Sequence, residues 1–245
     1  MNVQSRPQLA IECSGCAQRS SEYFCDLPDE ASAIFRKVKI AHSYPRGTTL
    51  FAEGQPANGV YTLCSGRVKL STYSEDGKAI IVRVVEAGGV LGLSACIAGL
   101  NHEATAQVLE NCQVHFVRRE EFFDLIEQSP AAAIKAMEEL SRNYYHAHSQ
   151  ICSLGLSASA GDKLAKLFLE WFDHTADEPD ACGRHIPISY THEEMAEMIG
   201  ASRETVTRLL KSFSNRGLIT LRRNDLYIPD RQKLASAIGC RHSAM

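Results

Sequence analysis

Apolar and polar positions follow the most regular pattern in the stretch 190–214, where their spacing predicts two short helices joined by a tight turn. Thr191 followed by Glu194 is typical of a capping box, in which a hydroxyl and a carboxylate satisfy backbone N–H groups at the start of a helix. Gly200 interrupts the pattern, and Ser202 begins the second helix as its N-cap. The apolar side of this second helix consists of Val206, Leu209, Leu210 and Phe213. Two helices joined in this way form a helix-turn-helix, whose second helix enters the major groove of DNA.

The polar side of the second predicted helix carries side chains suited to reading DNA. It consists of Ser202, Arg203, Glu204, Thr207, Arg208 and Lys211. Arginine can contact guanine with two hydrogen bonds, glutamate can accept one from cytosine, and threonine can bond a base edge or a phosphate. The stretch 201–223 holds six basic residues and one acid in a chain of net charge −3, which indicates a local phosphate-facing surface. The alternative is an ordinary amphipathic helix pair with a solvated basic side.

A short hairpin is predicted directly after the second helix. Gly217 ends that helix, and the runs 218–221 and 226–228 have the apolar character of two short strands. Arg222 and Arg223 fall at the tip between them, where we expect them to contact phosphate. The helix pair and the hairpin together predict a winged helix-turn-helix.

Between residues 44 and 117 the pattern changes to short runs that favour β-strands, separated by turns rich in glycine. The expected strands are 48–51, 60–63, 68–73, 80–85 and two more within 104–117. Several short strands of similar length predict a small double-sheet β-roll of the jelly-roll kind. An unrelated β domain is the alternative.

The stretch 130–156 is predicted to form one long helix with an apolar seam. The seam positions, spaced alternately by three and four residues, are Met137, Leu140, Tyr144, Ala147, Ile151 and Leu154. Such a heptad pattern favours a second helix as its cover, although the chain's own β-roll could cover part of it. Small residues at 155–161 predict a hinge, followed by an amphipathic helix at 163–172 and a polar loop at 173–184.

The composition of the chain indicates the general class of protein and little more. The chain has 245 residues, of which 44% are hydrophobic and 22% charged, as is ordinary for a globular protein. No apolar run approaches the roughly 18 residues of a membrane span, and the N-terminus lacks the apolar segment of a signal peptide, so we expect a cytoplasmic protein without a membrane partner. The chain has no P-loop, nucleophile elbow or HExxH motif, which argues against an enzyme.

The nine cysteines form an odd number, which favours reduced thiols or metal ligation over a disulfide framework. Cys13 and Cys16 are spaced so that both can reach one metal or cluster, and Cys25 follows. An iron–sulfur site, a zinc site and plain thiols that pack an N-terminal arm all remain open. A redox or metal-binding protein that uses these cysteines without specific DNA binding is therefore the alternative function.

Two stretches resemble the catabolite-activator/fumarate-nitrate-reduction regulator (CRP/FNR) family of bacterial transcription factors. SRETVTRLL, between EEMAEMIGA and NRGLITLRRNDLYI, resembles the family's DNA-binding end, and PRGTTLFAEGQPANGVYTLCSGRVKLS with EDGKAIIVRVVEAGGVLGL is similar to its cyclic-nucleotide-binding-type β-roll. The resemblance covers roughly residues 31–233. It implies an α+β fold with a cysteine-containing arm at 1–30, a sensor β-roll at 31–129, a dimerisation helix at 130–156 and a winged helix-turn-helix at 157–245.

The resemblance also implies roles and partners. Glu204, Thr207 and Arg208 would read bases, and Arg203 matches the family version that recognises TGTGA-like half-sites. The implied partners are double-stranded DNA with an inverted-repeat site, a second copy of the chain, and RNA polymerase. A signal at the N-terminal region would change how two subunits meet along the central helix and so control DNA binding.

Two departures from the family bear on cofactors. Some members bind an oxygen-sensing [4Fe–4S] cluster through N-terminal cysteines and a fourth ligand. That ligand aligns here with His115, and either His115 or Cys112, three residues earlier, could complete a site, but the gap from Cys16 to Cys25 is longer than the family's. A cyclic-nucleotide site needs a carboxylate for the ribose and an arginine for the phosphate. The carboxylate is absent, and His102-Glu103 replaces the family's Arg-Ser, so we expect no cAMP binding.

Overall fold

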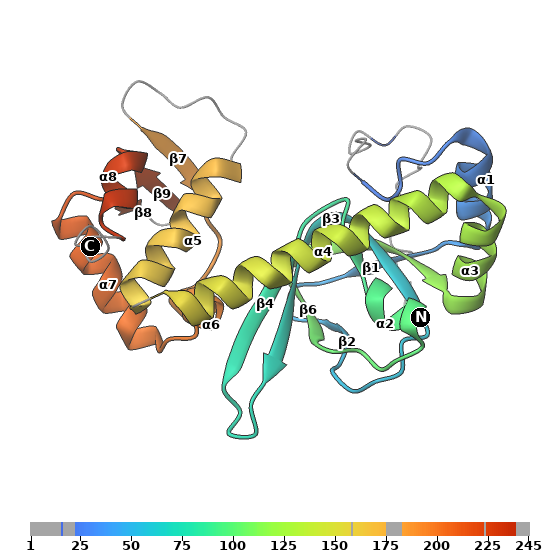
Figure 1. Cartoon of the computed structure of the whole chain (residues 1–245), viewed down its shortest axis with the longest axis horizontal. Helices are drawn as coiled ribbons and strands as arrows, with labels where there is room; N and C mark the ends of the chain where they lie inside the picture. The colour runs from blue at the N-terminus through green and yellow to red at the C-terminus, as the bar shows by residue number, and fades with distance from the viewer. Residues whose placement is uncertain (1–15, 17–22, 158, 175–182, 223, 239–245) are drawn as a thin grey trace, which may run out of the picture. The chain divides into compact units, whose positions relative to one another are not determined.

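The computed structural model describes residues 16, 23–157, 159–174, 183–222 and 224–238. The chain forms two compact units, one of Met1–Asp76 with Ile81–Ala147 and the other of Gly77–Ile80 with His148–Met245. Each unit has its own helices and sheet (Figure 1). The fold is α+β, as the sequence predicts. The four-part division at residues 30, 129 and 156 stays a prediction.

The first unit is built on a β-roll of six strands. They are β1 (Ile40–Tyr44), β2 (Thr49–Phe51), β3 (Gly59–Tyr73), β4 (Ala79–Val85), β5 (Val90–Leu91) and β6 (Thr105–Arg118). The strand order in the sheet is β1-β6-β3-β4, and in addition β2 pairs with β6 and β5 pairs with β3. Strand β6 is antiparallel to β1, β2 and β3, and β3 is antiparallel to β5. The four short strands predicted within 60–73 and 104–117 are in fact two long strands, β3 and β6. Register shifts between Leu63 and Val68 let β3 bend without ending.

Two apolar clusters stabilise this unit. One lies within the roll and includes Phe51, Leu63, Val85, Val108 and Val114. The other joins the roll to the helices α1 (Asp29–Val38), α2 (Leu93–Ala98) and α3 (Arg119–Gln128), and includes Phe24, Phe35, Val60, Phe122 and Leu125. None of these three helices appears in the sequence-based expectations.

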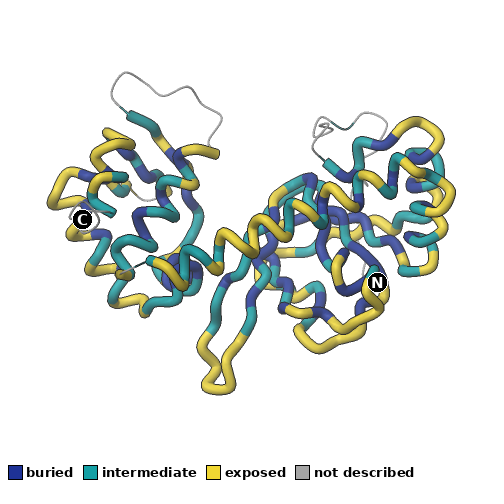
Figure 2. Tube along the Cα trace, viewed as in Figure 1, coloured by how far each residue is buried: buried dark blue, intermediate teal, exposed yellow. Residues whose placement is uncertain are grey.

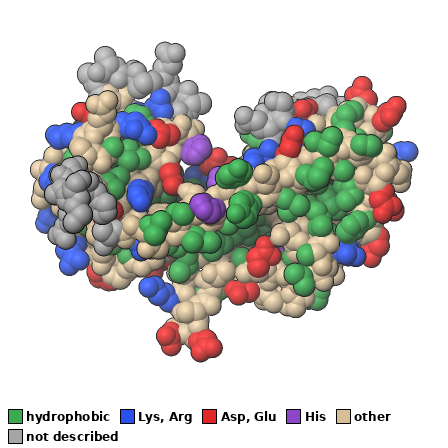
Figure 3. Space-filling model, viewed as in Figure 1, with side chains coloured by type: hydrophobic (Ala, Val, Ile, Leu, Met, Phe, Trp, Pro, Cys, Tyr) green, Lys and Arg blue, Asp and Glu red, His purple; other side chains and the backbone are tan. Residues whose placement is uncertain are grey.

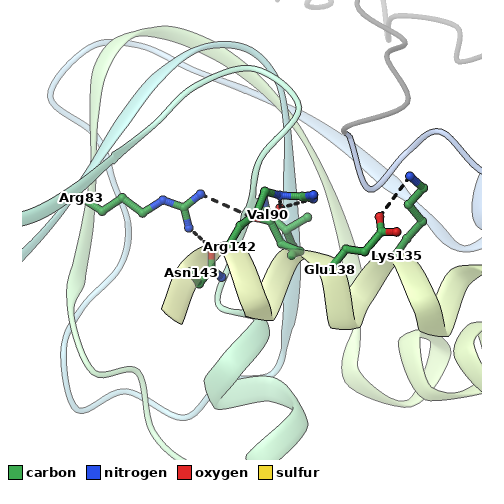
Figure 4. A network of polar contacts seen from close by, with 7 residues as sticks. Arg83, Val90, Lys135, Glu138, Arg142 and Asn143 are labelled. Carbon is green, nitrogen blue, oxygen red and sulfur yellow. Dashed lines mark hydrogen bonds and ion pairs between the residues drawn. The ribbon is translucent and has the colours of Figure 1, made fainter. Parts of the chain in front are cut away.

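Helix α4 (Pro130–Leu156) has the bounds that the sequence predicts, and its first half packs on the roll. Ala132 and Ala136 belong to the second cluster. The carboxylate of Glu139 is only 2% exposed. Its Oε2 accepts from Arg142 Nη2 at 2.9 Å, while its Oε1 lies 3.4 Å from Arg83 Nη2 of β4. Asn143 Oδ1 accepts a further hydrogen bond from Arg83, and Figure 4 shows Arg83 directed toward this helix.

The middle of α4 is exposed in the single chain (Figure 2). Met137, Tyr144 and Ile151, seven residues apart, are 60%, 67% and 70% exposed. Leu140 differs from these seam positions because it packs partly against the second cluster. Most of the predicted seam therefore lacks a cover within the described chain.

The second unit contains packed helices beside a small sheet. Its elements are α5 (Ala160–His174), β7 (Arg184–Pro187), α6 (His192–Ile199), α7 (Arg203–Asn215), β8 (Thr220–Arg222), β9 (Asp225–Ile228) and α8 (Arg231–Ser236). The sheet order is β7-β9-β8, so the predicted two-stranded wing has a third strand, which begins at Arg184, the last residue of the predicted loop. Phe168 and Phe213 meet edge to face at 6.5 Å between ring centroids, joining α5 to α7. Within the described ranges, no helix combines the length and apolar character needed to cross a bilayer.

Candidate nucleic-acid interface

The start of α6 is fixed by the predicted capping box. The backbone N–H of Thr191 donates to Oε2 of Glu194 at 2.7 Å, and the backbone N–H of Glu194 donates to Oγ1 of Thr191 at 3.1 Å. The Glu194 side chain is buried, so these bonds are shielded from water. The box orients the first turn of α6, including His192.

The turn between α6 and α7 depends on one glycine and one cap. Gly200 has φ of 64°, in the left-handed region that other residues adopt at a cost. Ser202 then caps α7, since its Oγ accepts from the backbone N–H of Thr205 at 3.2 Å. Both features agree with the sequence-based prediction, and they set the angle at which α7 leaves α6.

Helix α7 has a buried side and an exposed polar side. Val206, Leu210 and Phe213 are at most 4% exposed and pack into the core of the unit. The exposed positions include all those of this helix and its cap that are predicted to contact DNA, namely Ser202, Arg203, Glu204, Thr207, Arg208 and Lys211. Figure 3 shows several Lys and Arg side chains on the surface of this unit. The packing therefore leaves the polar side of α7 open to solvent.

Glu204 stands at the first turn of α7. Its own backbone N–H and the Ser202 hydroxyl hold the pKa of the Glu204 carboxyl below its usual range. The side chain is therefore ionised at neutral pH and can only accept hydrogen bonds. That property suits the amino group of cytosine.

Thr207 makes two contacts within the protein that sequence reasoning missed. Its Oγ1 donates to the carbonyl oxygen of Arg203 at 2.9 Å, one helical turn earlier. The same oxygen lies 2.9 Å from Nδ1 of His192 in α6. His192 was not among the predicted site residues, because nothing in a single sequence signals that these two positions meet. The spacing of the two helices around the turn is what brings them together.

The small sheet supplies the second basic element. Arg222 is exposed at the end of β8, and its partner in the β8–β9 register is Asp225. Arg223, predicted to share the tip, lies outside the described residues. On β7, His185 Nδ1 is 2.7 Å from Oδ2 of Asp225, which links the third strand to the base of the turn.

The predicted metal ligands are dispersed over the described part of the first unit. Cys13 lies outside the described residues, and Cys16 and Cys25 are half-buried. Cys112 belongs to the cluster inside the roll, where burial raises the pKa of its thiol. His115 is an odd number of positions further along β6, so its side chain points to the other face, against Phe35 of α1.

Both ring nitrogens of His115 have polar neighbours. Nε2 is 3.2 Å from Nζ of Lys39, and Nδ1 is 3.3 Å from Sγ of Cys64. Burial, with the charge of Lys39, lowers the pKa of His115 to about 4. Across the described ranges, no three His, Cys, Asp or Glu side chains gather as a metal site would require. Because Cys13 lies outside the described residues, the cluster site stays a prediction.

A second buried histidine, His102, is the residue that the resemblance aligns with the family's arginine for the cyclic phosphate. The ring of His102 is 5% exposed and stacks on Phe51 with 3.7 Å between centroids and 12° between planes. Burial lowers the pKa of His102, so the ring is neutral at pH 7, and its Nδ1 is buried without a hydrogen-bond partner among the described residues. A neutral imidazole carries no positive charge that could form an ion pair with a phosphate.

Comparisons with known proteins agree with both units. A family model described as a cyclic nucleotide-binding domain matches residues 41–129, and one described as a Crp-like helix-turn-helix domain matches residues 162–237. A CRP-like cAMP-activated global transcriptional regulator of Mycobacterium tuberculosis is 26% identical over 208 residues, which cover 85% of this chain and 92% of the relative.

Solved structures share the fold. FixK2 from Bradyrhizobium japonicum matches with a TM-score of 0.72 at 22% identity, covering 83% of this chain and 98% of that one. A transcriptional regulator of the CRP/FNR family from Thermus thermophilus matches with a TM-score of 0.64 at 21% identity, covering 82% of this chain and 100% of that one.

Proposed function

This chain belongs to the CRP/FNR family of transcription regulators, and on that premise we propose that it binds an inverted-repeat DNA site as a homodimer. It is a regulator with a helix-turn-helix domain rather than an enzyme, since its relatives are transcriptional regulators. A redox or metal-binding protein without specific DNA binding would leave the helix-turn-helix unexplained and is not favoured. RNA polymerase is proposed as a further partner on family grounds alone.

The observation that carries the DNA-binding proposal is the division of α7 into two sides. Its apolar positions are buried, while Arg203, Glu204 and Arg208 are exposed in the first half of the helix. The N-terminal part of a recognition helix is the part that meets base edges. Arg208 would read guanine and Glu204 cytosine, whereas Lys211 and Arg222 would contact phosphate.

Dimer formation is supported by the exposed apolar side of α4. Met137, Tyr144 and Ile151 recur at the heptad interval, and each is more than half exposed. Leaving such a row in water is unfavourable, and a second copy of the helix would cover it. Two subunits so paired would present two α7 helices to two half-sites about one DNA turn apart.

The sensor roll is proposed to respond to a signal other than cAMP. The relative from Mycobacterium tuberculosis is described as cAMP-activated. In this chain, the residue that the resemblance aligns with the phosphate-binding arginine is His102, whose buried ring stacks on Phe51. A phosphate brought there would lose its hydration without gaining an ion pair.

Iron–sulfur binding remains a prediction that the proposed function does not need. The described residues do not bring Cys16, Cys25 and either Cys112 or His115 together. Anaerobic purification followed by iron and sulfide analysis and a visible spectrum would test the prediction. Colourless protein without iron after anaerobic reconstitution would refute the iron–sulfur prediction.

The DNA-binding proposal is tested by selecting bound sequences from a random pool with the purified full-length chain. The expected result is an inverted repeat, bound by two subunits with affinity at least about a thousandfold above random DNA. Arg36→Ala is the control for arginine substitutions on the polar side of α7, because Arg36 is an exposed arginine on α1 of the other unit. Failure to enrich any sequence, with and without oxygen, would refute the proposal.

A further inference from the structure

Thr207 is exposed on the polar side of α7, and its hydroxyl is already engaged by the protein. A threonine hydroxyl has one hydrogen to donate and two lone pairs that can accept. The hydrogen is directed to the carbonyl oxygen of Arg203, 2.9 Å away. Thr207 therefore has no hydrogen left to donate to a base or a phosphate.

His192 fixes this arrangement from the neighbouring helix. Its Nδ1 lies 2.9 Å from Oγ1 of Thr207. Because the Thr207 hydrogen is used on Arg203, both contacts are hydrogen bonds together only when Nδ1 of His192 carries a hydrogen and donates it. The donated bond occupies one lone pair of Oγ1. A rotation of the Thr207 side chain would break both bonds at once.

The two ends of this contact are held independently. His192 is the residue that follows the Thr191 cap, so the capping box with Glu194 fixes its backbone. Thr207 lies in α7, whose start is fixed by the Ser202 cap. The contact is therefore made by two ordered helix segments rather than by flexible loops.

What Thr207 can still offer to DNA is its methyl group and a single lone pair. In the major groove the group that meets a threonine methyl favourably is the 5-methyl group of thymine. We propose that His192 is a positioning residue that holds Thr207 with its hydroxyl turned to the protein, so that Thr207 selects a thymine in each half-site through its methyl group. This inference rests on the proposed DNA-binding function.

The test uses the selected inverted repeat with each thymine replaced in turn by deoxyuridine, which removes only the 5-methyl group. Full-length wild-type protein is expected to bind one such substitution about fourfold more weakly per half-site, the factor for one apolar carbon removed from contact. Thr207→Ser, which lacks the methyl group, should lose this discrimination. Thr207→Val lacks the hydroxyl but keeps a methyl group held by the single rotamer that valine strongly prefers in a helix, so it should retain the discrimination without the His192 contact.

His192 is tested by two variants. His192→Leu removes the donor and should reduce the ratio of affinities for thymine and deoxyuridine sites toward one. His192→Asn should preserve the ratio, because its amide nitrogen stands close to the place of Nδ1 and can donate. A merely structural or phosphate-binding role for His192 would change both affinities equally and leave the ratio unaltered.

The outcomes separate this inference from the proposed function. Specific binding without sensitivity to any thymine methyl, or an unchanged ratio in His192→Leu, would overturn the inference alone. Absence of sequence-specific binding by the wild-type protein would refute the proposed function. If His192→Leu loses its thermal unfolding transition, His192→Asn still tests the positioning role, because a ratio reduced toward one in that variant would overturn it. The comparison of Thr207→Val with Thr207→Ser tests the methyl contact, since Thr207 is exposed.

Discussion

Arg83 of β4 approaches Glu139 of α4, with 3.4 Å between Nη2 and Oε1, and so joins the β-roll to the long helix. Arg142 and the backbone N–H of Val90 also donate to this carboxylate. Burial lowers the pKa of Arg83, and the charge of Glu139 opposes that shift. A buried carboxylate with several donors is costly to neutralise, because its partners lose their acceptor.

Replacing Glu139 with glutamine is therefore expected to lower the free energy of unfolding of the full chain by about 3 kcal/mol. Urea unfolding followed by circular dichroism measures this change. Glu138→Gln is the matched control, since Glu138 pairs with Lys135 on the surface and its loss should change stability by less than about 0.5 kcal/mol. Equal effects for the two variants would contradict the role assigned to Glu139.

The buried His102 predicts a dependence of stability on pH. Its folded-state pKa lies below the ordinary value of 6.5, so the unfolded chain takes up a proton first as the pH falls. Stability should therefore decline as the pH decreases from about 6.5 through the folded-state pKa.

His102→Phe retains an aromatic stack on Phe51 and removes the titrating ring, so its stability should depend less on pH across that window. Thermal unfolding at a series of pH values measures the slope for each protein. Exposed His42 on β1 offers the control variant His42→Phe, which makes the same substitution away from the buried stack. A slope for His102→Phe equal to that of wild type would show that another group controls acid stability.

Substitution at the exposed seam of α4 should weaken dimer formation. Tyr144→Glu places a charge where an apolar side chain is expected to meet its counterpart, and the dimer dissociation constant should rise by about tenfold or more. Sedimentation equilibrium measures it. His146→Glu is the control, as that residue is exposed on the same helix outside the heptad positions. A wild-type protein that is monomeric in solution would refute the proposed homodimer.

The two predicted kinds of DNA contact should differ in how they affect specificity. Arg208→Ala is expected to cost about 1–3 kcal/mol on the selected site and to relax base preference at one position. Arg222→Ala should weaken selected and random DNA alike and reduce the salt dependence. Fluorescence anisotropy titrations at several salt concentrations distinguish them. Equal losses on both DNAs for Arg208→Ala would mean that Arg208 contacts phosphate only.

Cyclic AMP titrated into the chain by calorimetry is expected to give no binding heat, because His102 is neutral and buried. A dissociation constant in the micromolar range would overturn this expectation. His102→Arg would show whether restoring a cation is sufficient to create affinity. Because the ribose carboxylate is also missing, we expect it to be insufficient.

Local signals in the sequence were enough to predict the helix-turn-helix and α4. A capping box, a left-handed glycine and a serine cap act within a few residues, so Thr191, Gly200 and Ser202 could be assigned without knowing what packs on them. The same holds for the heptad spacing of Tyr144 and Ile151. The heptad spacing does not show which seam positions the chain itself covers, since Leu140 packs partly against the second cluster while Tyr144 and Ile151 are exposed.

Features that depend on distant partners were missed. Strand β1 is largely exposed and has no alternating pattern, so only its pairing with β6 defines it. Strand β7 similarly exists because it pairs with β9. Glu139 reads as a surface residue of a helix, yet the approach of β4 and Val90 buries it. The contact of His192 with Thr207 depends on the angle between two helices, which a single sequence does not contain.

The anchoring of Glu139 limits how a signal could act on α4. Turning the helix about its own axis by even a fraction of a turn would carry the carboxylate away from Arg83 and expose an uncompensated charge. The roll and the first half of the helix are thus expected to rotate as one block. A change in the twist of α4 is therefore expected in the part of the helix after Asn143, which these bonds no longer connect to the sheet.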